Sequence, residues 1–199
     1  RKYLKQFLMD KRVVDIFRPL WWLILNGPIL TFRPSKSGKA YQKIWDKENY
    51  GSPLRKFTIN QTSKIKKIFK NYKNISIDYA MRYGTPEIEK TLNKMTEKGC
   101  SKILLVPLYP QYAASTSATV KDEVFKWMLK QRWQPDLRTI APWFDDQQYI
   151  KALAETIKKN IRNRKKLDKL VVSFHGIPKR YFMAGDPYHC HCIKTCLLY

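Results

Sequence analysis

His175, near the end of the chain, is the residue type best suited to proton transfer near neutral pH. It follows an apolar run at residues 170–174, which has the composition of a buried strand, and Gly176 and Pro178 come after it. In open α/β sheets, ligands bind in the crevice outside the carboxyl ends of the strands. An imidazole there is suited to accept a proton or to hold a metal ion. A lone histidine in this position is more often structural, so the surrounding residues have to decide.

Two other predicted strands also end in residues that can bind a ligand. After residues 75–80 come Met81, Arg82 and Tyr83. Arginine binds anions, and methionine packs well against a flat apolar molecule. Taken by themselves, a surface ion pair for Arg82 and a core position for Met81 are the better explanations.

The strand predicted at residues 103–106 leads into a loop rich in proline and tyrosine. Pro107, Pro110, Tyr109 and Tyr112 make this loop rigid and aromatic. Rigidity alone explains these residues as well as a binding role does. Because the carboxyl ends of parallel strands meet at one edge of a sheet, the three loops would point to one crevice.

The elements that carry these loops alternate between strand and helix. This rhythm predicts an α/β fold, in which helices cover both faces of a parallel sheet. The expected order is a strand at 75–80, a helix that opens at Thr85 with Pro86 in its first position and ends near Lys98-Gly99, a strand at 103–106, a helix at 119–132, a strand at 138–140, a helix at 147–164 and a strand at 170–174.

Three of the four cysteines lie close together near the end of the chain. Cys190, Cys192 and Cys196 have a density that suits an iron–sulfur cluster or zinc, and plain thiols are the alternative. The isolated Cys100 is expected to be a buried structural thiol. Because no signal peptide and no spread-out cysteine framework are visible, we expect a reducing compartment.

The chain is strongly basic, with 39 Lys and Arg against 16 Asp and Glu and a net charge of +23. Three explanations compete. The lysines are scattered over the sequence, which favours a solvated basic surface, and association with an anionic membrane comes second. Nucleic-acid binding ranks third, because no helix-turn-helix spacing, RNA-binding motif or zinc finger is present.

An apolar segment at residues 20–30 contains the pair Trp21 and Trp22 and is flanked by Arg18 and Arg33. It is too short to span a bilayer, and Asn-Gly-Pro interrupts it. Paired tryptophans with flanking arginines suit a membrane–water boundary, and they suit a protein core equally well.

The residues around His175 resemble a known family. Residues 173–181, followed by Gly185-Asp186-Pro187-Tyr188, are similar to the signature of ferrochelatases, which insert ferrous iron into a porphyrin to make haem. Met81-Arg82-Tyr83 and the loop at 108–116 resemble two further segments of that family. The resemblance covers essentially all of this chain but only the middle of the family.

The resemblance implies an α/β fold of two similar doubly wound, Rossmann-like halves in the full protein. Residues 1–145 would form most of the first half, and residues 146–199 would begin the second. Family members also use a carboxylate opposite the histidine, which would lie outside this chain. We therefore expect this stretch alone to be inactive.

The resemblance also implies roles for individual residues. His175 would accept a pyrrole proton or transiently bind Fe²⁺, and Asp186 would cap the next helix or fix its turn. The cysteines Cys190, Cys192 and Cys196 would be three ligands of a [2Fe-2S] cluster. The porphyrin pocket would be lined by Met81, Arg82, Tyr83, Arg33, Ser52 and Tyr112.

The implied reaction is terminal haem synthesis from Fe²⁺ and protoporphyrin IX. The Trp21–Trp22 lip would face a membrane surface, so we expect a cytoplasmic protein or a peripheral protein of the inner membrane, with no nucleic-acid partner. Two alternatives stay open. One is a chelatase for another metal or tetrapyrrole, and the other is a non-catalytic porphyrin-binding protein at the membrane, which would not need His175.

Overall fold

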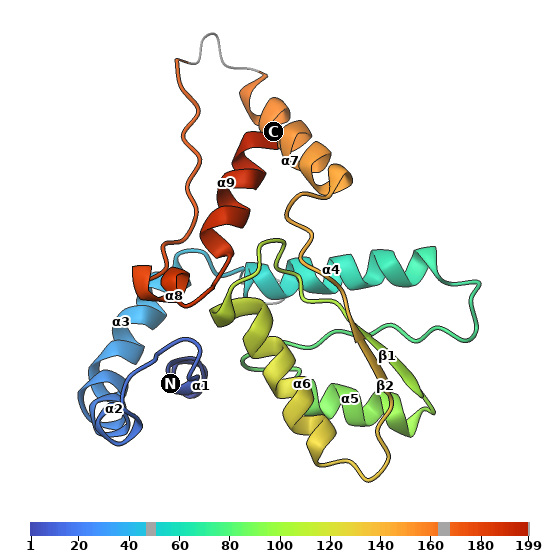
Figure 1. Ribbon diagram of the computed structural model, residues 1–199, viewed down its shortest axis with the longest axis horizontal. Helices are drawn as coiled ribbons and strands as arrows, with labels where there is room; N and C mark the ends of the chain where they lie inside the picture. The colour runs from blue at the N-terminus through green and yellow to red at the C-terminus, as the bar shows by residue number, and fades with distance from the viewer. Residues whose placement is uncertain (47–50, 163–167, 199) are drawn as a thin grey trace. The chain divides into compact units, whose positions relative to one another are not determined.

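The computed structural model describes residues 1–46, 51–162 and 168–198, and it contains helices and one small sheet (Figure 1). Helices occupy most of the described chain. The elements in chain order are α1 (Lys2–Met9), α2 (Arg18–Ile24), the π-helix η1 (Leu25–Ile29), α3 (Leu30–Gln42), α4 (Pro53–Ile68), α5 (Ile88–Glu97), β1 (Lys102–Leu105), the π-helix η2 (Ala114–Ala118), α6 (Thr119–Leu129), β2 (Asp136–Thr139), α7 (Gln147–Ile161), α8 (Lys179–Met183) and α9 (Tyr188–Leu198).

The sheet consists of β1 and β2, which run parallel. The Asp136 N–H donates to the Ser101 carbonyl at 2.9 Å, and the Ile140 N–H donates to the Leu105 carbonyl at 3.2 Å. From the first hydrogen bond to the second, both strands advance by four residues in the same chain direction, which is the pattern of a parallel pair. The α/β class is therefore confirmed, and both strands lie within two residues of their predicted bounds.

Two predicted strands do not form. Residues 75–80 and 170–174 take no regular structure, and Val171 is 86% exposed. A strand exists only where a neighbouring backbone completes its hydrogen-bond ladder. Within the described residues neither segment has such a neighbour. The prediction that His175 directly follows a buried strand is therefore wrong for this structure.

By their contacts, the described residues divide into two compact units. The first contains Arg1–Ile103 and Asp122–Asp136, and the second contains Leu104–Lys121 and Leu137–Tyr199. The predicted halves at 1–145 and 146–199 concern a longer protein and stay a prediction.

The first unit has a small apolar core at its N-terminal helices. Leu8, Trp21, Leu25 and Leu30 are buried together, and the indole N–H of Trp21 donates to the Leu8 carbonyl at 2.7 Å. Trp22, one residue further along α2, is 52% exposed. Trp21 is therefore a core residue, and of the pair only Trp22 lies on the surface, where the membrane-boundary alternative stays a prediction. None of the helices in the described part of the chain is long and apolar enough to cross a bilayer.

Helix α5 begins later than its sequence predicts. Its N-cap is Glu87 and not Thr85, because Pro86 is engaged elsewhere: its carbonyl accepts a hydrogen bond from the Met81 N–H at 2.8 Å. This bridge ties the start of the helix to the segment that carries Arg82. The predicted stop is confirmed, since Gly99 follows the helix with a φ of +83°, which favours glycine.

Helix α7 is the element that the sequence predicts best. Its N-cap, Asp146, accepts hydrogen bonds from the N–H groups of Gln148 and Tyr149, both at 3.0 Å. Such a cap satisfies two of the N–H groups that a helix start leaves without a partner.

Candidate functional site

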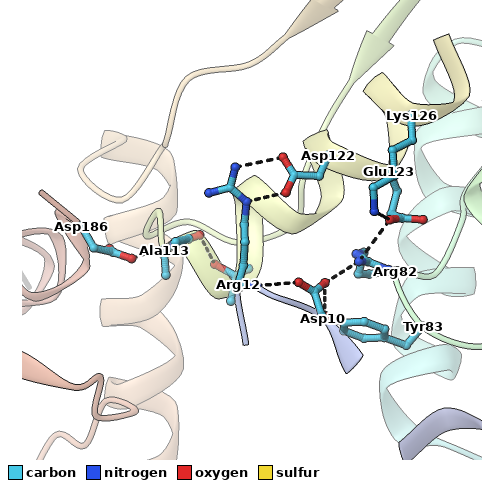
Figure 2. Close-up of polar contacts among 11 residues, drawn as sticks. Asp10, Arg12, Arg82, Tyr83, Ala113, Asp122, Glu123, Lys126 and Asp186 are labelled. Atoms are coloured by element: carbon cyan, nitrogen blue, oxygen red, sulfur yellow. Dashed lines mark hydrogen bonds and ion pairs between the residues drawn. The ribbon is translucent and has the colours of Figure 1, made fainter. Parts of the chain in front are cut away.

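In the first unit, Arg82 belongs to a dense set of polar contacts (Figure 2). Its guanidinium forms an ion pair with Asp10 and lies 3.5 Å from a carboxylate oxygen of Glu123. Asp10 also accepts from the Tyr83 hydroxyl at 3.0 Å and from the Arg12 backbone N–H at 2.8 Å. The Asp10 side chain is 7% exposed and that of Arg82 is 14% exposed. We call these five residues the Arg82 cluster.

Aromatic rings of α1 pack onto the same segment. The Tyr83 ring meets Phe7 edge-on at 5.3 Å and Tyr3 edge-on at 6.1 Å between ring centroids. The Arg82 guanidinium lies 4.4 Å from the centroid of the Tyr83 ring, and the Gly84 N–H donates to the Gln6 side chain at 3.0 Å. Helix α1 therefore fixes residues 82–84 through charge, ring packing and backbone contact together.

These contacts favour the ion-pair explanation that the residues alone suggest for Arg82. The family resemblance implies a place in a ligand pocket instead, which stays a prediction. In the structure its charge is compensated by Asp10 and Glu123. A ligand carboxylate would have to compete with an ion pair that is already partly desolvated.

In the second unit, His175 lines a cavity of about 570 Å³. The apolar part of the wall includes Val172, Phe174, Phe182 and Ile193. Within the described residues, the His175 imidazole has no hydrogen-bond or ion-pair partner, and the residue is exposed. The cavity thus combines an accessible imidazole with apolar walls, which suits a flat apolar ligand that exchanges protons.

Other groups at this cavity are held in their neutral forms. Burial raises the pKa of the Cys192 thiol, and a hydrogen bond with the Tyr188 hydroxyl lowers it by less. Burial likewise raises the pKa of Tyr188. At neutral pH Cys192 is therefore a thiol, which is a poor metal ligand compared with a thiolate.

The predicted [2Fe-2S] ligands do not come together. Cys192 and Cys196 lie one turn apart on α9 and both line the cavity, whereas Cys190 is absent from its lining. Residues two apart on a helix differ by about 200° in direction, so Cys190 and Cys192 point away from each other. In residues 1–46, 51–162 and 168–198, no group of three or more His, Cys, Asp or Glu side chains could hold a metal ion. The arrangement does not fit a cluster bound by these three cysteines.

Helix α9 also holds the proline- and tyrosine-rich loop that follows β1. The Tyr112 N–H donates to Nδ1 of His191 at 3.1 Å, and the Gln111 side chain donates to the Thr195 hydroxyl at 3.0 Å. The Ala114 N–H donates to Oδ2 of Asp186 at 2.7 Å. We call Asp186, His191 and Thr195 the α9 clasp.

Asp186 has the capping role that the sequence predicts, and a second one. Its Oδ1 accepts from the Tyr188 N–H at 3.0 Å at the start of α9, while its Oδ2 holds Ala114. The preceding Gly185 has a φ of +94°, a conformation that favours glycine. The Gly-Asp pair therefore turns the chain, caps α9 and anchors the loop.

The roles of His191 and Thr195 were not predicted from the sequence. Thr195 is fully buried, and its hydroxyl contacts the Phe144 and His191 carbonyls at 2.9 and 2.8 Å. Burial lowers the pKa of His191, more than the nearby carboxylates Asp145 and Asp186 raise it. His191 and Thr195 are four residues apart, which places both on one face of α9. This spacing was the feature of the sequence that could have identified them.

The predicted site residues are divided between the two units. Arg33 is exposed on α3, Ser52 is the N-cap residue of α4, and Met81 is half-buried at its bridge to Glu87. These lie in the first unit together with Arg82 and Tyr83. The second unit holds Tyr112, His175, Cys190, Cys192 and Cys196.

Fold and site together define an α/β protein with an apolar cavity that presents an imidazole. A sequence model of the family Ferrochelatase matches residues 1–199, so the chain belongs to the ferrochelatase family. The chain is 51% identical over 196 residues to a ferrochelatase of Allorhizobium ampelinum, covering 98% of this chain and 57% of the relative. It is 48% identical over 199 residues to that of Agrobacterium fabrum, covering 100% and 58%, and 51% identical over 197 residues to that of Chromobacterium violaceum, covering 98% and 54%.

Proposed function

We propose that the full-length protein inserts Fe²⁺ into protoporphyrin IX, giving protohaem and releasing two protons. Membership of the ferrochelatase family supports this, and the observation that carries it is the exposed His175 imidazole at an apolar cavity. The chain spans a little over half the length of its relatives, 57% in the first of them.

The chemistry assigned to His175 is proton acceptance. A metal enters the ring only when both pyrrole N–H protons leave, and imidazole, with an ordinary pKa of about 6.5, accepts a proton near neutrality. The same neutral nitrogen is an acceptable ligand for ferrous iron. Apolar walls next to it match the face of a porphyrin and exclude water from the ring centre.

We propose that Met81, Tyr83, Ser52 and Tyr112 contribute to the porphyrin pocket. For the anionic propionates, Arg33 is a better candidate than Arg82. Arg33 is exposed on α3, whereas the Arg82 guanidinium is compensated by two carboxylates. In this proposal Arg82 acts by holding residues 81–83 in place.

Surface association with the inner membrane, on its cytoplasmic side, is part of the proposal. Helix α2 and its flanks expose Phe17, Leu20, Trp22 and Leu23. Exposed aromatic and aliphatic side chains beside Arg18 suit the headgroup boundary of a bilayer. The net charge of +23 adds attraction to anionic lipids.

The test is Fe²⁺ insertion into protoporphyrin IX by the full-length protein, comparing wild type with His175→Ala. We expect the rate of insertion to fall by roughly 10²- to 10⁴-fold, the usual contribution of a general base, while porphyrin binding is kept. The matched comparison is His189→Ala, which removes a second imidazole from the same cavity.

Three results would contradict the proposal. If wild type binds porphyrin without inserting iron, the protein is a carrier. If His175→Ala keeps its activity, the base lies elsewhere. If His189→Ala loses as much activity as His175→Ala, the role is not specific to residue 175. We also expect the 199-residue chain alone not to turn over, because the resemblance assigns a second catalytic group to a region outside it.

A further inference from the structure

The loop after β1 is held by α9 through backbone groups as well as side chains. Two of the three contacts are made by backbone N–H groups, those of Tyr112 and Ala114, which donate to His191 and Asp186. A backbone contact fixes the position of a residue without occupying its side chain. The Tyr112 side chain therefore takes no part in this hydrogen bond.

The imidazole of His191 is fixed from two sides. Its Nδ1 accepts the Tyr112 N–H, and its ring stacks on Phe144 with 3.7 Å between centroids and 10° between planes. Phe144 is tied in turn to Thr195, whose hydroxyl contacts its carbonyl. An imidazole accepts at Nδ1 only when that nitrogen carries no proton, so this arrangement also selects one tautomer.

We propose that His191 is a positioning residue for porphyrin binding: it holds the Tyr112 backbone so that the Tyr112 ring keeps its place in the pocket wall. This inference rests on the proposed function, in which Tyr112 contacts the porphyrin. The Lys121 ammonium lies 5.9 Å from the centroid of the Tyr112 ring, and the hydrogen bond from α9 fixes the backbone that carries this ring.

Two substitutions separate the hydrogen bond from the ring packing. His191→Phe keeps an aromatic ring on Phe144 and removes the acceptor. His191→Asn places an amide oxygen near the position of Nδ1 and removes the ring. A matched control is Lys151→Gln, an exposed position on α7.

In the full-length protein, we expect His191→Phe to weaken protoporphyrin binding by roughly five- to tenfold, measured by fluorescence quenching, since one hydrogen bond is lost. The KM for porphyrin should rise by a similar factor, while kcat changes less than twofold. His191→Asn should bind within about twofold of wild type. In both wild type and His191→Asn, the Tyr112 amide should be protected from hydrogen exchange, and in His191→Phe it should exchange faster.

Each variant can overturn the inference without the other. If His191→Phe binds porphyrin as wild type does, the hydrogen bond does not position Tyr112. If His191→Asn is weakened as strongly as we expect for His191→Phe, ring packing is what matters. A fall in kcat at constant KM would also overturn it. Failure of the proposed function looks different, because wild type itself would then insert no iron.

Discussion

The Arg82 cluster and the α9 clasp both hold a loop next to candidate site residues, but they use different interactions. The Arg82 cluster relies on charge, with one guanidinium between two carboxylates. In the α9 clasp the loop is held by a neutral imidazole, a hydroxyl and a single carboxylate. Removing one member of a poorly solvated ion pair leaves an uncompensated charge, whereas removing a neutral acceptor leaves only an uncharged donor without its partner, which costs less. A single substitution should therefore lower the free energy of unfolding more in the Arg82 cluster than in the α9 clasp.

The largest effect is expected for Asp10→Asn. This change keeps an oxygen for the Tyr83 hydroxyl and removes only the charge that balances Arg82. We expect the free energy of unfolding of the full-length protein to fall by about 3 kcal/mol, measured by urea denaturation. The matched control is Asp122→Asn, which breaks the exposed pair with Arg12, whose Nη2 lies 3.0 Å from an Asp122 oxygen. That pair is worth less than about 1 kcal/mol.

If Asp10→Asn and Asp122→Asn lost equal free energy of unfolding, burial of the Arg82 ion pair would make no difference to its contribution, and the expected contrast between the two ion pairs would be wrong. A loss well below 1 kcal/mol in Asp10→Asn would mean that Glu123 alone compensates the guanidinium.

An intermediate effect is expected for Thr195→Val in the α9 clasp. The substitution keeps the shape of the side chain and leaves the Gln111 amide without its acceptor. We expect a loss of about 1–2 kcal/mol in unfolding free energy, measured in the same way. Thr156→Val on α7 is the matched control. Both hydroxyls bond the carbonyl four residues earlier, at 2.8 Å, but Thr156 is exposed. If Thr195→Val and Thr156→Val lower the free energy of unfolding equally, the contacts of Thr195 with Gln111 and Phe144 contribute nothing to stability.

The smallest effect is a dependence of stability on pH at Asp145. Lys194 donates to this carboxylate at 2.6 Å, and this hydrogen bond lowers the pKa of Asp145 below its ordinary value of 3.8. A lowered folded-state pKa adds stability above the unfolded pKa, and this contribution is lost as pH falls through the folded pKa. We expect the Tm of Asp145→Asn to fall less steeply than that of wild type as the pH is lowered below about 4.

Lys194→Met should give the same shallower profile as Asp145→Asn, because it removes the other partner. If the Tm of both variants still falls as steeply with pH as that of wild type, other carboxylates cause the loss of stability at acid pH.

The sequence was a good guide wherever structure depends on neighbours in the chain. Helix α7 begins at its predicted first residue, Gly99 ends α5, and Asp186 caps α9. Each of these depends on residues a few positions apart, whose hydrogen bonds are local. The strand β1 was also found, because its apolar run is short and clearly bounded, and β2 was found although it carries little apolar sequence.

Contacts between distant segments were not predictable in this way. Asp10 and Arg82 are 72 positions apart, and no spacing rule connects them. The Tyr112–His191 bond spans 79 positions and uses a backbone group, which carries no sequence information. Residues 75–80 and 170–174 have the composition of strands, but composition does not supply the partner that a strand requires. The candidate roles of His175 and of the pocket residues came from the family resemblance and stay predictions.

The different surroundings of Trp21 and Trp22 have a consequence for their fluorescence. Two adjacent indoles in one helix have different surroundings: one is packed among leucines and bonded to the Leu8 carbonyl, and the other faces solvent. Their emission should differ in wavelength and in access to a dissolved quencher such as iodide. In a variant whose other four tryptophans are replaced by phenylalanine, Trp22 would therefore report on whatever covers the surface of α2, and Trp21 would be a reference for the integrity of the core beneath it.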